Sequence, residues 1–71
     1  MEIKIKDSLT SSILAMEEAI WELEELIISH EDDFSEMEYS DIITAKELSQ
    51  SVRDMCAMIM KQYATRIKKK D

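Results

Sequence analysis

Apolar residues between positions 8 and 30 recur at alternating intervals of four and three. They are Leu9, Ile13, Met16, Ile20, Leu23 and Ile27. This spacing keeps the side chains on one face of an α-helix, whereas a half-buried strand would need an apolar residue at every second position. Asp7 and Ser8, which stand at the start of the pattern, are both good N-cap residues. The sequence therefore predicts an amphipathic helix over about 8–30.

The chain contains no glycine and no proline among its 71 residues. Tight β-turns and glycine-rich phosphate loops depend on these residues, so the composition favours two long helices and one connection. A chain this short buries a small core and usually needs a disulfide, a metal or a partner chain. Cys56 is the only cysteine, which leaves no internal disulfide. We therefore expect a single domain over 1–71 that gains further burial by pairing with a second copy.

Two positions can start the second helix. Ser35 and Glu38 have the spacing of a capping box, and Phe34 and Tyr39 have that of the matching hydrophobic staple. The dipeptide 40–41, a serine followed by an aspartate, is a second N-cap candidate. The two starts differ in which residues of the second helix lie level with the first.

The later start matches the apolar layers of the two helices better. It pairs Leu23 with Leu48, Ile20 with Val52, Met16 with Met55, Ile13 with Ile59 and Leu9 with Tyr63. We therefore predict an all-α fold, an antiparallel two-helix hairpin over about 8–30 and 41–67, with a short helical turn near 35–39. We expect this hairpin to dimerise into a four-helix bundle.

The two ends of the chain carry patterns of their own. Ile3 and Ile5 alternate with charged residues, as in a strand, but so short a strand is not stable without a partner. We expect residues 1–6 to form a short extended or frayed N-terminal arm. Residues 68–71 contain three consecutive lysines and are expected to form a frayed basic C-terminal tail.

The charge is strongly acidic and unevenly distributed. Sixteen acidic and nine basic residues give a net charge of −7. Residues 1–41 hold thirteen of the acidic residues and two lysines, which is a net −11, and residues 42–71 have a net +4. An acidic protein is repelled by nucleic acid and anionic membranes, so we expect no direct nucleic-acid binding. No apolar run reaches membrane-spanning or signal-peptide form, and the unpaired cysteine fits a cytoplasmic location.

Two apolar features are left over after the helical seam is assigned. Leu14, Trp21 and Ile28, spaced by seven, form a second stripe on the first helix, beside Glu17 and Glu24. The segment 55–60 is apolar through more than one turn of the second helix and includes Met58 and Met60. One partner helix cannot cover such a segment, and methionine suits adaptable contacts. The candidate partner-binding residues are Leu14, Trp21, Ile28, Glu17, Glu24, Met58 and Met60.

The sequence contains no combination of residues that would indicate catalysis, a cofactor site or a metal site. It has one histidine, one cysteine and no glycine-rich loop. We therefore expect a small protein-binding or regulatory module, not an enzyme, that acts on another protein through an apolar face rimmed by glutamates. The alternative is an acidic mimic of nucleic acid that blocks a basic groove. Small acidic phage inhibitors of bacterial defence systems work in this way, and the chain resembles them in size and charge.

Overall fold

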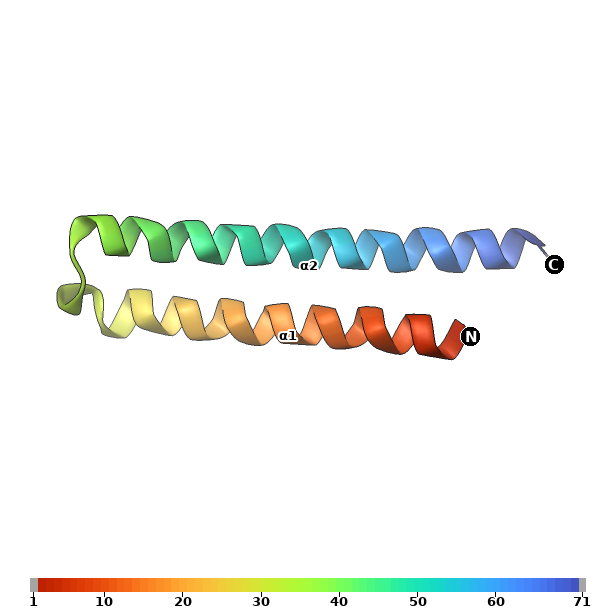
Figure 1. Ribbon diagram of the computed structural model, residues 1–71, viewed down its shortest axis with the longest axis horizontal. Coiled ribbons are helices and arrows are strands. Elements are labelled where there is room, and N and C mark those ends of the chain that lie inside the picture. Colours follow the sequence, from red (N-terminus) through yellow and green to blue (C-terminus); the bar gives the residue numbers. More distant parts are fainter. Residues whose placement is uncertain (1, 71) are drawn as a thin grey trace.

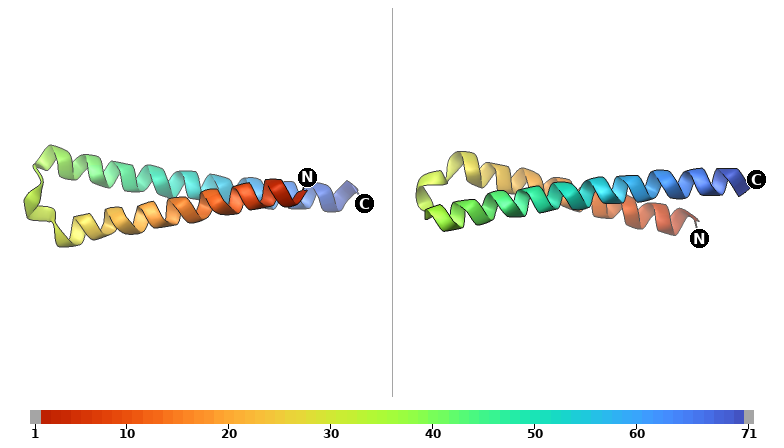
Figure 2. Two further views of the ribbon diagram at one scale, coloured as in Figure 1. Left: turned by 60° about the horizontal axis from the view of Figure 1, so that its bottom comes forward. Right: turned by 90° about the horizontal axis from the view of Figure 1, so that it is seen from above.

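The computed structural model describes the backbone of residues 2–70 and the side chains of residues 3–67. Helix α1 spans Glu2–Ser29, a 3-10 turn η1 spans Glu31–Asp33, and helix α2 spans Glu36–Lys70. The two long helices run antiparallel and pack against each other along their length (Figure 1). They cross at a shallow angle, so that α2 passes obliquely over α1 (Figure 2). The all-α helical hairpin predicted from the sequence is confirmed.

The connection between the helices is built without glycine. His30 has φ −131° and ψ 23°, η1 makes one tight turn, and Phe34 is extended at φ −119° and ψ 147°. Within residues 2–70 no residue has a positive φ, so the reversal needs no left-handed conformation. The His30 Nδ1 atom lies 3.1 Å from an Asp33 carboxylate oxygen across the turn. A 3-10 turn followed by an extended residue therefore replaces the usual glycine turn.

Helix α2 begins at the capping box. The Ser35 backbone N–H donates to the Glu38 carboxylate at 2.9 Å, and the Glu38 N–H donates to Ser35 Oγ at 3.2 Å. Phe34 and Tyr39 are both half-buried, as the hydrophobic staple requires. The predicted start near 41 is therefore wrong, because the turn expected at 35–39 is the first turn of α2 itself.

The predictions for the two ends also need correction. The expected arm over 1–6 is helical from residue 2 onwards, so α1 begins six residues before the predicted start at 8. Residues 68–70 continue α2 and are not a frayed tail. Positions 1 and 71 lie outside the described residues. Both helices are longer than predicted: α1 continues through residues 2–6 despite their strand-like alternation, and α2 begins at the earlier cap and continues to Lys70.

The early start of α2 changes the residues that face α1. Half-buried residues recur along α2 at intervals of three and four, and we call this series the α2 seam. It consists of Tyr39, Ile42, Lys46, Ser49, Arg53, Cys56, Met60, Tyr63 and Ile67. On α1 the predicted seam is confirmed, with Ile20 buried at 5% exposure and its neighbours in the pattern half-buried. The predicted layers that paired Leu48, Val52, Met55 and Ile59 with α1 are wrong, because these four residues are exposed.

We predict that the Glu38 cap makes stability depend on pH. Its hydrogen bond from the Ser35 N–H, followed by that with the Ser35 side chain, lowers the pKa of Glu38 below its ordinary value. A lowered pKa means that the contribution is present above the unfolded-state pKa and is lost as pH falls through the folded-state pKa. Thermal unfolding should find Glu38→Gln less stable than the wild type at neutral pH, with the difference shrinking in acid. Glu36→Gln, in the same turn without this hydrogen bond, should show a weaker pH dependence; equal behaviour of the two variants would contradict the assignment.

We also predict a sharp contrast between two isoleucines on α1. Ile20→Ala should lower the free energy of unfolding by about 2–4 kcal/mol, because it removes the most buried side chain of the seam. Ile28→Ala, at a side chain that is 77% exposed, should change it by less than about 0.5 kcal/mol. Urea denaturation at a fixed chain concentration measures both. A similar loss in the two variants would show that the seam is not the core.

Candidate protein-binding surfaces

The stripe Leu14, Trp21 and Ile28, called here the Trp21 stripe, lies on the surface of α1. Its side chains are 60–77% exposed. Each of the three follows a seam residue of α1 by one position, which rotates it by about 100° away from the seam. Glu17 and Glu24 are exposed beside the stripe. The structure therefore places five of the predicted partner-binding residues along one acidic flank of α1.

The two predicted methionines lie elsewhere. Met58 is 60% exposed and faces outward on α2, whereas Met60 belongs to the α2 seam and is half-buried. Residues equally far from the loop lie level in a hairpin, so Met58 is near the open end, beside the start of α1. The Trp21 stripe extends toward the loop end instead. The seven predicted residues therefore do not form one continuous surface.

A second apolar surface, which the sequence analysis assigned to the core, lies on α2. We call it the α2 ridge, and it consists of Ala45, Leu48, Val52, Met55 and Ile59. The four large side chains of the ridge are 40–62% exposed, and Ala45 is half-buried. Their intervals of three and four were visible in the sequence, but the α2 seam has the same intervals. The spacing of the ridge is thus visible in the sequence, but the series that we predicted to be buried lies on the surface.

The ridge is more apolar than the seam that actually faces α1. Every ridge residue stands one position before a seam residue, and the middle of the seam contains Lys46, Ser49 and Arg53. The Arg53 guanidinium lies 3.3 Å from the carboxylate of its neighbour Asp54, and the Ser49 hydroxyl donates to the Ala45 carbonyl at 2.9 Å. These polar groups are partly satisfied within α2 itself. A lone hairpin whose facing series is polar at its middle, while a wholly apolar series lies outside, leaves much apolar area exposed.

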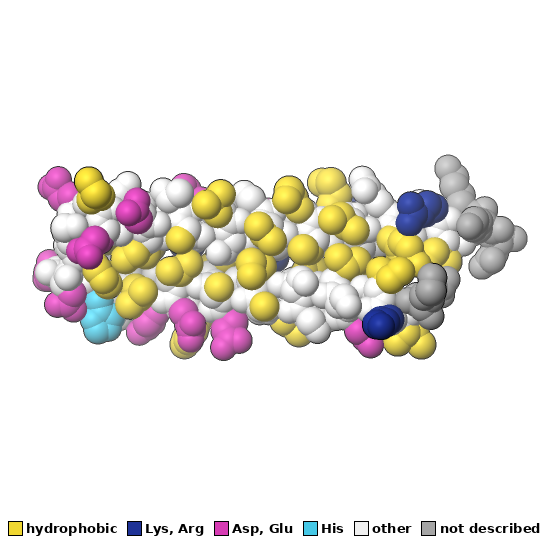
Figure 3. Space-filling view, viewed as in Figure 1, with side chains coloured by type: hydrophobic (Ala, Val, Ile, Leu, Met, Phe, Trp, Pro, Cys, Tyr) yellow, Lys and Arg dark blue, Asp and Glu magenta, His cyan; other side chains and the backbone are white. Residues whose placement is uncertain are grey.

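The Trp21 stripe and the α2 ridge lie on opposite sides of the hairpin. Positions that follow the seam lie on one side of both helices of an antiparallel pair, and positions that precede it lie on the other side. The stripe follows its seam by one residue and the ridge precedes its seam by one. Figure 3 shows one side, where hydrophobic side chains cover α2 and the groove between the helices, with acidic side chains along the edge of α1. The hairpin therefore offers two separate surfaces.

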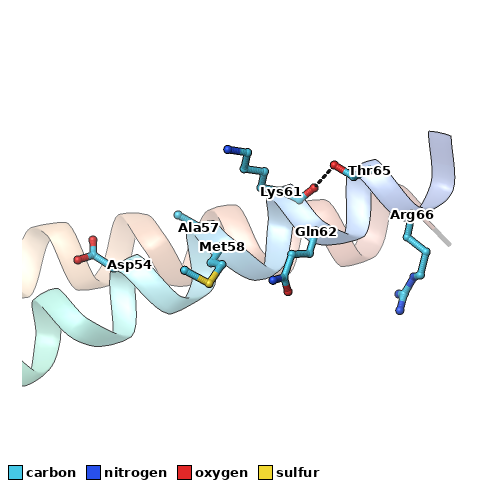
Figure 4. Close-up of a pocket in the computed structure, with 7 residues that line it drawn as sticks. All are labelled: Asp54, Ala57, Met58, Lys61, Gln62, Thr65 and Arg66. Carbon is cyan, nitrogen blue, oxygen red and sulfur yellow. Dashed lines mark hydrogen bonds between the residues drawn. The ribbon is translucent and has the colours of Figure 1, made fainter. Parts of the chain in front are cut away.

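A shallow depression near the open end is not an enclosed site. The side chains that line it all belong to α2: Asp54, Ala57, Met58, Lys61, Gln62, Thr65 and Arg66. They point in different directions around the helix, and the one hydrogen bond drawn, from the Thr65 hydroxyl to the Lys61 carbonyl, stays within the helix (Figure 4). The Arg66 guanidinium lies 5.1 Å from the centre of the Tyr63 ring. With no wall from α1, the depression has no interior that would enclose a small molecule.

The described residues contain no cluster of three or more His, Cys, Asp or Glu side chains that could hold a metal ion. Cys56 is a free, half-buried thiol of the α2 seam. Neither α1 nor α2, over the residues described, has an apolar stretch that would cross a bilayer.

Comparisons with known proteins leave the surfaces as the main guide to function. No family model, no curated protein and no solved structure matches this chain.

We predict that the Trp21 side chain is accessible to water and to quenchers in solution. Its indole is 66% exposed on the flank of α1, on the side opposite the α2 ridge. Its fluorescence emission should be red-shifted and readily quenched by acrylamide, close to that of a free tryptophan derivative measured in parallel. A blue-shifted or protected emission would contradict the placement.

Proposed function

We propose that this protein is a small protein-binding or regulatory module that acts without catalysis through the Trp21 stripe. The observation that supports the proposal is a line of large, exposed apolar side chains with glutamates on both sides. Tryptophan is enriched among the residues that dominate binding energies, and exposed apolar stripes with a polar rim are typical of interaction surfaces. The fitting partner is a protein segment that presents apolar side chains flanked by lysine or arginine.

The proposal includes pairing of the hairpin with a second copy into a four-helix bundle in the cytoplasm. The accessible surface of the hairpin is 5892 Å². A compact monomer of the same mass, 8.3 kDa, would expose about 4600 Å². Among the described side chains the hairpin buries Ile20 to 5% exposure, and it leaves both the stripe and the large side chains of the ridge exposed. Pairing is the simplest way to bury more apolar area, and the free thiol fits a reducing compartment.

A second candidate function is that of an acidic mimic of nucleic acid. The observation that favours it is the concentration of charge, with eleven acidic and no basic residues between positions 8 and 45. Such a protein would block a basic groove, and its binding would depend on charge. The two functions differ in their dependence on salt, because screening weakens ionic contacts and leaves apolar contacts largely intact.

We predict that affinity purification with the full chain captures a partner whose binding depends on Trp21. Trp21→Ala should weaken binding by about 2 kcal/mol or more, roughly 30-fold, because it removes the largest apolar side chain of the stripe. Met37→Ala is the matched control, since Met37 is also apolar and is 77% exposed. The measurement is a binding titration of the captured partner at low and high salt.

Binding by the stripe should survive high salt and be lost in Trp21→Ala. Binding that collapses with salt and does not respond to Trp21→Ala would instead support the acidic mimic. Equal losses in Trp21→Ala and Met37→Ala would show that the stripe is not the binding surface.

A further inference from the structure

We infer that the α2 ridge is covered by the α2 ridge of a second copy of this chain, running antiparallel, so that the two loops lie at opposite ends of the dimer. This inference rests on the proposed pairing of hairpins, and it names the surface and the orientation. It does not depend on whether the Trp21 stripe binds another protein, because the stripe lies on the other side of the hairpin.

The ridge has the spacing of a helix–helix contact. Ala45, Leu48, Val52, Met55 and Ile59 repeat at intervals of three and four, which is the spacing of a helix that packs against another helix. The α2 seam already fills the side of the helix that faces α1. A second series with the same spacing, rotated by one residue and 40–62% exposed at its large side chains, therefore indicates a second helix–helix contact.

The ridge is nearly symmetric about its own centre. Val52 lies near the middle of α2, which spans Glu36–Lys70. An antiparallel pair of ridges centred there places Val52 against Val52 and the small Ala45 against the larger Ile59, with Leu48 and Met55 within one residue of the same level. An interface between two copies related by a two-fold axis must be complementary to itself in this way. Small side chains opposite large ones also let the two helices interlock.

Charge also favours this orientation. The loop half of the hairpin, residues 17–41, holds eleven acidic residues and no basic residue. The described side chains of the open end, residues 3–7 and 55–67, include four basic residues and one acidic residue. An antiparallel dimer places each acidic loop half beside the basic open end of the other copy. The opposite arrangement would bring the two acidic loops together, where like charges repel.

The exposed area of the hairpin is large enough for such an interface. The hairpin exposes about 1300 Å² more than a compact monomer of its mass. A stable interface buries about 800 Å² on each partner. The large ridge side chains are 40–62% exposed, and the side of the hairpin in Figure 3 shows many hydrophobic side chains over α2 and between the helices, where such an interface can form. One pairing therefore removes much of the excess exposure of the hairpin.

Disulfide trapping of the full chain tests the inference. In a Cys56→Ser background, Val52→Cys places a thiol at the two-fold axis, where the two Cβ atoms come within the short range that a disulfide needs. Met58→Cys in the same background is the matched control, since Met58 is exposed on α2 but lies off the ridge. We expect Val52→Cys to form the covalent dimer under mild oxidation, and Met58→Cys to remain largely monomeric on a non-reducing gel. Equal trapping of the two variants would overturn the inference.

Sedimentation equilibrium supplies the second measurement. The wild type should sediment with the mass of two chains, Val52→Glu should lose the dimer, and Leu14→Glu, on the Trp21 stripe, should keep it. If Val52→Glu also loses helical circular dichroism, the trapping experiment alone decides. A monomeric wild type, or a dimer lost in Leu14→Glu and kept in Val52→Glu, would overturn the inference. Ala45→Cys and Ile59→Cys chains, mixed in the same background, should form the mixed disulfide, and ready self-trapping of each variant alone would overturn the antiparallel orientation. None of these outcomes bears on partner binding through Trp21, so the two proposals fail separately.

Discussion

The packing of α2 against α1 is the constraint on which the rest of this structure depends. The α2 seam is apolar near the loop, at Tyr39 and Ile42, and again near the open end, at Met60 and Tyr63. Between these ends it contains Lys46, Ser49 and Arg53. Long basic side chains can bury their aliphatic stems while their charged groups reach water, which makes this central stretch tolerable but weakly stabilising. The buried Ile20 of α1 lies level with the beginning of this stretch and supplies the apolar contact that these polar side chains do not.

The capping box at Ser35 and Glu38 fixes the residue at which α2 begins. Because Ser35 caps α2 only two residues after η1, the loop is short and the axial position and rotation of α2 are both set by it. With α2 beginning at this position, the seam from Tyr39 to Ile67 faces α1 and the Leu48–Ile59 series remains on the surface.

The two exposed surfaces differ in chemistry. The Trp21 stripe is narrow and lies among carboxylates, which suits a partner that combines apolar and basic side chains. The α2 ridge is longer and is flanked by small or uncharged positions of α1 such as Ser12, Ala15 and Ala19, which suits a second apolar helix. Since the surfaces lie on opposite sides, a dimer formed through the ridges would present two Trp21 stripes outward. Self-association and partner binding are therefore compatible in this fold.

Local patterns were enough to predict much of the molecule. The periodicity of Leu9 to Ile27, the lack of glycine and proline, and the capping signals define two helices and one reversal, because helix formation and capping depend on neighbours within a few residues. The exposure of Leu14, Trp21 and Ile28 also followed from their position one residue beyond the seam. These inferences needed no knowledge of how the helices pack.

The tertiary structure alone decided which face of α2 is inside. Ridge and seam have the same spacing and differ by a rotation of about 100°, so periodicity cannot distinguish them. Matching apolar layers favoured the ridge as core, because this criterion assumes that one hairpin must bury its most apolar series. The short loop overrides that assumption, leaving Val52 outside and Arg53 inside. The strand-like residues 2–6 are helical as well, since the adjoining helix extends into a segment that has no strand to pair with.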